Sequence, residues 1–226
     1  MRYALRVCMT DRPGMLGALA TALGDAAVDI VALDVIDRAD AVTVDDLRVE
    51  GEVSAQRLTA VCEAVPGVVV EALAAVRAPH VRRTDAGLAA DIAETAGSPL
   101  QDLVAGLPEA LDGSWCVAVE DAGSGIETLA ASTGAPPVPA GLRLHFLPLS
   151  TARRLPQAQW MPEQWQAGPG DRLEIATAPL HGPLSSVLLA RVNGARFRGH
   201  ELRRLAELCR VAVAAEQRRS PVTAGV

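Results

Sequence analysis

The residues with the clearest chemical potential form a short loop near the N-terminus, Asp11, Arg12, Pro13 and Gly14. The apolar residues after this loop recur at the spacing of one helix face, so the loop precedes a helix N-terminus. Such an end presents unpaired N–H groups and a positive dipole to a carboxylate, and a glycine lets a ligand approach the backbone closely. Asp11 can accept an ammonium group. These residue types can therefore bind a small ligand that carries both a carboxylate and an ammonium group.

A purely structural interpretation of the same loop stays open. Asp11 can cap the helix and Pro13 can occupy its first turn, as these residue types often do. The two interpretations differ in whether the Asp11 carboxylate is available to a ligand.

The elements around this loop are predicted from apolar periodicity. A polar turn is expected at Asp37–Asp40, and Ser54 is the expected cap of a second helix. The order strand, helix, strand, strand, helix, strand is that of ferredoxin-like folds. The expected strands are 3–9, 29–36, 42–49 and 68–76, and the expected helices lie at 16–23 and 55–65.

The loop Asp11–Leu16, together with the later segment Val28–Val31, resembles the signature of the ACT family of regulatory domains. The resemblance covers residues 3–77. It implies a sensor of free amino acids that binds its ligand between two copies, and therefore a homodimer. The ligand contacts it implies are Asp11, Arg12, Gly14, Met15 and Leu16 of one copy, with Asp29, Ile30 and Val31 of the other.

Two positions depart from the pattern of some amino-acid-binding members. Asp29 stands where those members carry an asparagine, and Met9 stands where they carry a polar residue. Asp11 and Asp29 would repel each other if both faced one pocket without a cation between them. The ligand ammonium compensates for this repulsion, or the site is altered or lost.

A second domain is expected after a linker with a short helix at its end, residues 78–97. Ser98 followed by Pro99 is a strong helix start, and Pro108 should end or kink that helix. A long helix is expected at Gly199–Gln217, followed by a flexible tail at 218–226. Strands are expected at 115–119, 126–131, 173–180 and 187–192, with mostly loop at 134–170.

The run Leu188–Arg191, with Phe197 and the helix that contains Glu201 and Leu205, resembles the closing strand and helix of GAF domains. The resemblance covers residues 86–217, and we take 98–217 as the GAF-like domain. It implies a central antiparallel sheet flanked by helices. Trp160 and Trp165 either line a cavity there or belong to the core. With the ACT-like domain at 1–77, the expected fold class is α+β.

The amino-acid composition argues against several classes of function. A net charge of −6 and an aromatic content of 3% argue against nucleic acid as a partner. Long uncharged apolar runs and a signal-peptide pattern are both lacking, so we expect no membrane association and a cytoplasmic location. Widely spaced cysteines and histidines predict buried, reduced thiols, no metal site and no cofactor.

Catalysis is not expected from this sequence. A reactive thiol needs an exposed, electropositive setting, whereas Cys116 and Cys209 lie in apolar patterns. His181 lies near Ser185 and Ser186 without an evident acidic partner. We therefore expect a non-catalytic regulatory protein that binds an amino acid at an ACT dimer interface. It would pass the signal through the GAF-like domain to an unknown protein partner. A dimerisation and protein-interaction module without a small ligand is the alternative.

Overall fold

The computed structural model describes residues 1–39, 41–75, 83–139, 141–156, 160–165, 168 and 172–219. The chain divides into two compact units, Met1–Val81 and Arg82–Val226. The described residues contain two antiparallel sheets and five α-helices, which makes the fold class α+β. Within these ranges, none of the helices is long and apolar enough to cross a bilayer.

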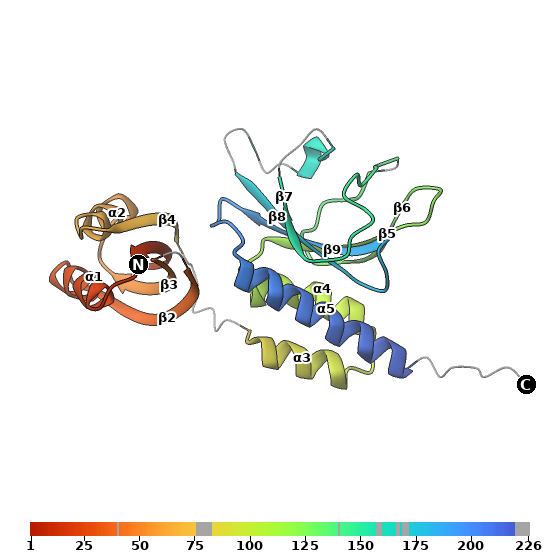
Figure 1. Cartoon of the computed structure of the whole chain (residues 1–226), viewed down its shortest axis with the longest axis horizontal. Coiled ribbons are helices and arrows are strands. Elements are labelled where there is room, and N and C mark those ends of the chain that lie inside the picture. The colour runs from red at the N-terminus through yellow and green to blue at the C-terminus, as the bar shows by residue number, and fades with distance from the viewer. Residues whose placement is uncertain are drawn as a thin grey trace, which may run out of the picture. The chain divides into compact units, whose positions relative to one another are not determined.

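The first unit has one four-stranded sheet in the order β2-β3-β1-β4, and every neighbouring pair is antiparallel. Figure 1 shows α1 and α2 on the same side of this sheet. The elements are β1 (Arg2–Thr10), α1 (Met15–Asp25), β2 (Val28–Ala39), β3 (Val42–Gly51), α2 (Ala55–Glu63) and β4 (Val68–Ala75).

Alternation along β1 builds the core of this unit. Tyr3, Leu5, Val7 and Met9 are all at most 4% exposed, because every second side chain of a strand points to the same face. They pack in one cluster with the apolar residues of α1 and α2. Burial of each large side chain contributes about 1.5–3 kcal/mol, which orients the helices against the sheet.

The polar stretch Asp37–Arg38 extends β2 instead of forming a turn, which corrects the expected end of this strand at Ile36. The register shifts at Ile30/Ala32 and at Val35/Asp37. Each bulge adds a residue to the edge strand and changes which of its side chains point to each face. The pairing with β3 continues beyond the bulges, where Arg38 pairs with Thr43. Residue 40 of the predicted turn lies outside the described residues, as does Val76 at the predicted end of β4.

The second unit has a five-stranded antiparallel sheet in the order β6-β5-β9-β8-β7. It includes α3, which the sequence analysis assigned to the end of a linker. Residues 78–82 of that linker and 220–226 of the tail lie outside the described residues. The elements are α3 (Asp85–Glu94), α4 (Pro99–Ala110), β5 (Trp115–Asp121), β6 (Ile126–Ala131), β7 (Arg153–Leu155), the 3₁₀ turn η1 (Glu163–Trp165), β8 (Leu173–Pro179), β9 (Ser185–Val192) and α5 (Gly199–Arg219).

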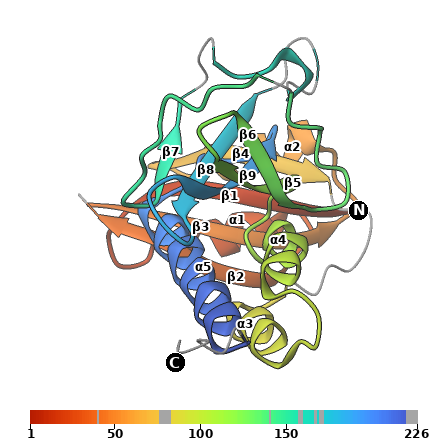
Figure 2. The ribbon, with the colours of Figure 1, turned by 90° about the vertical axis from the view of Figure 1, so that its right-hand side faces the viewer.

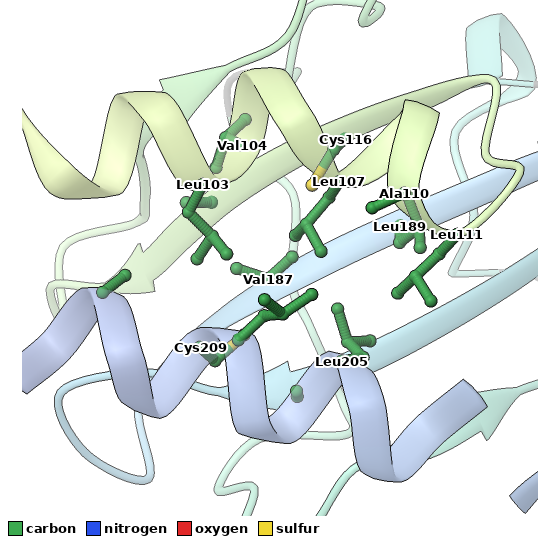
Figure 3. Close-up of a cluster of buried hydrophobic side chains, with 14 of the residues drawn as sticks. Leu103, Val104, Leu107, Ala110, Leu111, Cys116, Val187, Leu189, Leu205 and Cys209 are labelled. Atoms are coloured by element: carbon green, nitrogen blue, oxygen red, sulfur yellow. The ribbon is translucent and has the colours of Figure 1, made fainter. Parts of the chain in front are cut away.

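Helices α4 and α5 cover one face of this sheet, and α3 packs against these two helices (Figures 1 and 2). Leu103 and Leu107 of α4 point toward Val187 of β9 and Cys209 of α5, and all four are at most 1% exposed (Figure 3). Pro108 lies inside α4, which continues only to Ala110. The helices and this face of the sheet therefore share one buried apolar core.

The other face of the sheet is covered by the long segment between β6 and β8. Trp165 is 2% exposed, its ring packs edge-on against Trp115 at 5.5 Å, and its Nε1 donates to Pro137 O at 3.2 Å. Trp160 is half-buried and packs against Phe146 at 5.4 Å. Both tryptophans belong to a second core cluster, as their core interpretation predicts.

Candidate functional site

The loop between β1 and α1 ends on a glycine in the left-handed region. Gly14 is the N-cap of α1 with φ 91°, and no side chain caps the helix. Ala18 donates its backbone N–H to Gly14 O at 2.9 Å, which starts the helical ladder. A Cβ placed on Gly14 would meet no atom within 4 Å, so the residue is glycine because of its backbone conformation and not because of crowding. The first turn of α1 thus presents its N–H groups without a side-chain partner.

Asp11 does not cap α1, so the structural interpretation of this residue is wrong. Its carboxylate accepts two hydrogen bonds from Arg38 of β2, from Nε at 2.7 Å and from Nη2 at 2.8 Å. These bonds hold the pKa of Asp11 below its ordinary value. The Arg38 side chain is 70% exposed and the Asp11 side chain 27%, so the pair lies largely in solvent. The expected ammonium acceptor is therefore bound to the guanidinium of Arg38.

Other predicted residues of the loop have distinct surroundings. Arg12 extends across the loop, and its Nε lies 3.0 Å from Met15 Sδ. Met15 is 5% exposed and belongs to the core, whereas Leu16 is 39% exposed at the start of the helix. Of these two apolar side chains, Leu16 is the one accessible to a ligand.

The predicted contacts on β2 lie at the opposite end of the sheet from this loop. Asp29 pairs with Glu50, while Thr10, next to the loop, pairs with Val42. Val42 and Glu50 are eight residues apart on β3, so about 27 Å of strand separates the two ends. Ile30 is half-buried against the core, and Val31 is 60% exposed. One chain thus does not bring Asp29 and Asp11 together, and their repulsion does not arise within it.

Asp45 is a polar residue of this region that the sequence analysis did not identify. It pairs with Val7 of β1 and Val35 of β2, is 3% exposed, and its Oδ1 has no hydrogen-bond partner among the described residues. Burial, and then the charge of Asp46, raise the pKa of its carboxyl, whereas the positive charge of Arg38 lowers it. Asp45 has the same strand parity as Leu47 and Val49, and this parity was the signal that predicts an inward side chain.

The thiols of the second unit have surroundings that oppose reactivity. Burial raises the pKa of Cys209 to about 12 and raises that of Cys116 well above its usual range. Cys62 of the first unit is also buried, with a pKa raised to about 11. Cys8 departs from the expectation of a buried thiol, because it is only half-buried and its Sγ donates to Glu71 Oε2 at 3.4 Å.

His181 does have an acidic partner, which the sequence analysis missed. Its Nε2 lies 2.9 Å from Glu216 Oε2, on α5. The Ser185 and Ser186 hydroxyls are buried without a hydrogen-bond partner in the described structure, so neither completes a triad with this pair. Among the described residues, no group of three His, Cys, Asp or Glu side chains is placed to hold a metal ion.

Comparisons with known proteins complete this description. No family model matches the chain, and no curated protein matches it in sequence. A crystal structure of an unknown protein from Galdieria sulphuraria is 11% identical, with a TM-score of 0.31 over 96% of this chain and 92% of that chain. The chromophore-binding domain of an unusual bacteriophytochrome from R. palustris is 10% identical, with a TM-score of 0.41 over 96% of this chain and 94% of that one. Neither superposition is close enough to carry a functional argument.

Proposed function

We propose that this chain is a non-catalytic regulatory protein whose first unit is an ACT-type, ferredoxin-like module that binds a free amino acid. The element order β1-α1-β2-β3-α2-β4 and the strand order β2-β3-β1-β4 support this assignment. The proposed site is the loop at the start of α1, where Asp11, Gly14 and Leu16 are accessible.

The observation that carries the proposal is an uncapped helix N-terminus beside an exposed ion pair. An amino acid is itself a pair of opposite charges. Its carboxylate can accept from first-turn N–H groups of α1, which no described side chain caps, and its ammonium can replace Arg38 on Asp11. Two or three charged hydrogen bonds of about 1.5–3 kcal/mol each are sufficient for micromolar to millimolar affinity.

The remaining contacts would come from a second copy. The β2 edge runs from Val28 to Ala39 and exposes the apolar side chains of Val31 and Val35 by 60% and 57%. An open strand edge with exposed apolar residues favours pairing with another chain. In a homodimer, Asp29, Ile30 and Val31 of the partner copy would face the loop. Light scattering on the purified protein tests this, and a monomer at micromolar concentration would exclude an interface site.

The second unit is proposed to be a GAF-like domain that passes the signal to a protein partner. Its sheet carries helices on one face and a long covering segment on the other. Burial raises the pKa values of the Cys116 and Cys209 thiols, which supports a role without thiol catalysis. The alternative is an interaction module without a small ligand, which the exposed β2 edge also fits.

Thermal shift with a panel of the free amino acids tests the proposed function. A ligand at a hundred times its dissociation constant adds about 2.7 kcal/mol to stability, which is readily measured. Calorimetry on any hit then compares the parent with Asp11→Asn and Leu16→Glu. Asp11→Asn removes the ammonium acceptor, and Leu16→Glu sets a negative charge where the ligand carboxylate would lie. We expect each to weaken binding by about tenfold or more.

Ala20→Glu is the matched control for Leu16→Glu, because it adds the same charge to an exposed position one turn further along α1. It should leave binding nearly unchanged. Equal binding by the parent, Asp11→Asn and Leu16→Glu would place the ligand elsewhere. If no amino acid shifts the melting transition, the sensor proposal fails and the interaction-module alternative replaces it.

A further inference from the structure

Asp45 is buried on the helix-covered face of the first sheet, next to the proposed site. Its cross-strand neighbours Val7 and Val35 are apolar, and its Oδ1 lacks a partner among the described residues. An ionised group that is buried without a partner is strongly unfavourable. When Asp45 is ionised, its Oδ1 thus lacks the cation or hydrogen-bond donor that would stabilise the charge.

Charges around Asp45 identify which residue can supply that cation. Asp46, its neighbour in sequence, disfavours the ionised form of Asp45, and burial acts in the same direction. Arg38 acts in the opposite direction, because its positive charge attracts the Asp45 carboxylate. Arg38 is therefore the cation whose field reaches Asp45 in the described structure.

The strand register places Arg38 within reach of Asp45. Arg38 pairs with Thr43, and Asp45 follows two residues later on β3, so the two are diagonal neighbours. Such neighbours are about 7–8 Å apart at Cα, which a long arginine side chain spans. The bond that Arg38 now makes to Asp11 is exposed, and exposed ion pairs contribute little net stability. The guanidinium can therefore change partners at small cost.

We infer that Arg38 has two alternative carboxylate partners, Asp11 on the loop and Asp45 on β3, and that ligand binding moves it from the first to the second. The inference rests on the proposed function for its ligand. When the ammonium group of an amino acid binds Asp11, the displaced guanidinium neutralises the buried carboxylate. Asp45 is thereby a positioning residue of the site, although it does not contact the ligand.

This exchange of partners couples ligand binding at the loop to the contacts of the β2–β3 turn. Arg38 lies near the end of β2, and the backbone N–H of Asp11 donates to Ala41 O in the turn that follows, at 2.8 Å. A move of Arg38 toward Asp45 changes what holds the β2–β3 turn to the loop. The two states are Arg38 bound to Asp11 and Arg38 bound to Asp45. A ligand shifts this equilibrium only if it binds one state more tightly, and here Asp11 is available to the ligand only in the second state.

The exchange can be tested without any ligand, because Asp11→Asn removes the first partner of Arg38. The midpoint of Asp45 titration is followed by ¹³C NMR of its carboxyl carbon, and the signal is assigned by its loss in Asp45→Asn. The titration is repeated in the parent, Asp11→Asn, Arg38→Gln and the double variant. The Arg38–Asp11 pair that these substitutions remove is exposed to solvent. All four proteins should therefore fold.

We expect Asp11→Asn to shift the Asp45 midpoint to lower pH, because the freed guanidinium moves to Asp45. In the Arg38→Gln background the same substitution should cause a much smaller shift, since only the loss of a nearby negative charge remains. Equal shifts in the two backgrounds would overturn the inference. An amino acid that binds although the shifts are equal would sustain the site but not the exchange. Unequal shifts without any amino-acid binding would sustain the exchange and refute the sensor function.

Discussion

Each unit contains an arginine–carboxylate pair with a short N–O distance, and the two pairs differ in burial. Arg191 and Glu201 of the second unit are 4% and 0% exposed at their side chains, and Nη2 lies 2.7 Å from Oε1. Arg38 and Asp11 of the first unit have similar distances but are 70% and 27% exposed. The two pairs have similar distances, so the difference between them lies in how far each is buried and in what surrounds it.

The buried pair is surrounded by further partners that keep it in place. Arg191 donates from Nε to Asp112 O at 2.9 Å, from Nη1 to Ala195 O at 2.8 Å, and from Nη2 to Leu111 O at 2.5 Å. Its guanidinium carbon lies 4.0 Å from the centre of the Phe197 ring. Glu201 Oε2 accepts from the backbone N–H of Arg198 at 2.9 Å, at the start of α5. The ion pair therefore ties the loop after α4 to the start of α5.

The largest effect that would sharpen the comparison is expected from Glu201→Gln. It leaves Arg191 buried without its counter-charge, and breaking a buried pair in this way costs about 3–5 kcal/mol. All three tryptophans lie in the second unit, so urea unfolding followed by tryptophan fluorescence measures its stability directly.

Glu207→Gln is the control for that experiment. Glu207 lies on the exposed side of α5 and pairs with Arg210 at 3.9 Å, with 65% of its side chain exposed. Its loss should change the unfolding free energy by less than about 1 kcal/mol. A Glu201→Gln protein as stable as the control would show that the buried pair is not required, and the contrast between the two pairs would disappear.

Local patterns in the sequence predicted most of the fold. Ser54 and Ser98 cap their helices as expected, accepting from the N–H groups of Arg57 and Gln101 at 3.2 Å. The strand β7, Arg153–Leu155, was missed because three residues are too few to show a periodicity. The extension of β2 was missed because bulges interrupt its alternation. What is set by neighbours in sequence was thus predictable, and what is set by strand pairing was not.

The sequence predicted where the candidate site lies but not which residues contact its loop. Residue types predicted a site at the loop that contains Asp11 and Gly14, and its role in binding stays a prediction. Arg38 lies 27 residues from Asp11, and its choice of partner depends on where the β2–β3 hairpin ends. Asp45 shares the parity of two buried apolar residues, but a carboxylate in that position is ordinarily assigned to the surface.

Asp45→Asn is expected to stabilise the first unit at neutral pH, by about 1 kcal/mol, because it removes a buried charge whose oxygen lacks a partner. Burial raises the pKa of this carboxyl, so the folded state binds its proton more tightly than the unfolded state. As pH falls through the folded-state pKa, the unfolding free energy of the parent therefore rises relative to that of Asp45→Asn. The extra stability of Asp45→Asn disappears as pH approaches the unfolded-state pKa.

The measurement for this variant is urea unfolding followed by far-ultraviolet circular dichroism at several pH values, with tryptophan fluorescence separating the second unit. Asp46→Asn is an instructive companion, because Asp46 accepts from Arg6 Nε at 2.6 Å and from Nη2 at 2.7 Å. Its replacement breaks a pair and should destabilise the same unit. A loss of stability in Asp45→Asn at neutral pH would mean that Asp45 already has a stabilising partner.

The smallest effect is expected at the exposed pair itself. Asp11→Asn should change the unfolding free energy of the first unit by less than about 1 kcal/mol, because the exposed pair contributes little and the freed guanidinium can bind Asp45 instead. Cys62 is fully buried in this unit, so pulsed alkylation in urea, with peptides quantified by mass spectrometry, reports its unfolding. Asp25→Asn, at the exposed end of α1, is the control for loss of one surface charge. A destabilised Asp11→Asn protein beside an unaffected control would make Arg38–Asp11 a structural pair like Arg191–Glu201. An arginine bound that firmly could not be displaced by the ammonium group of an amino acid.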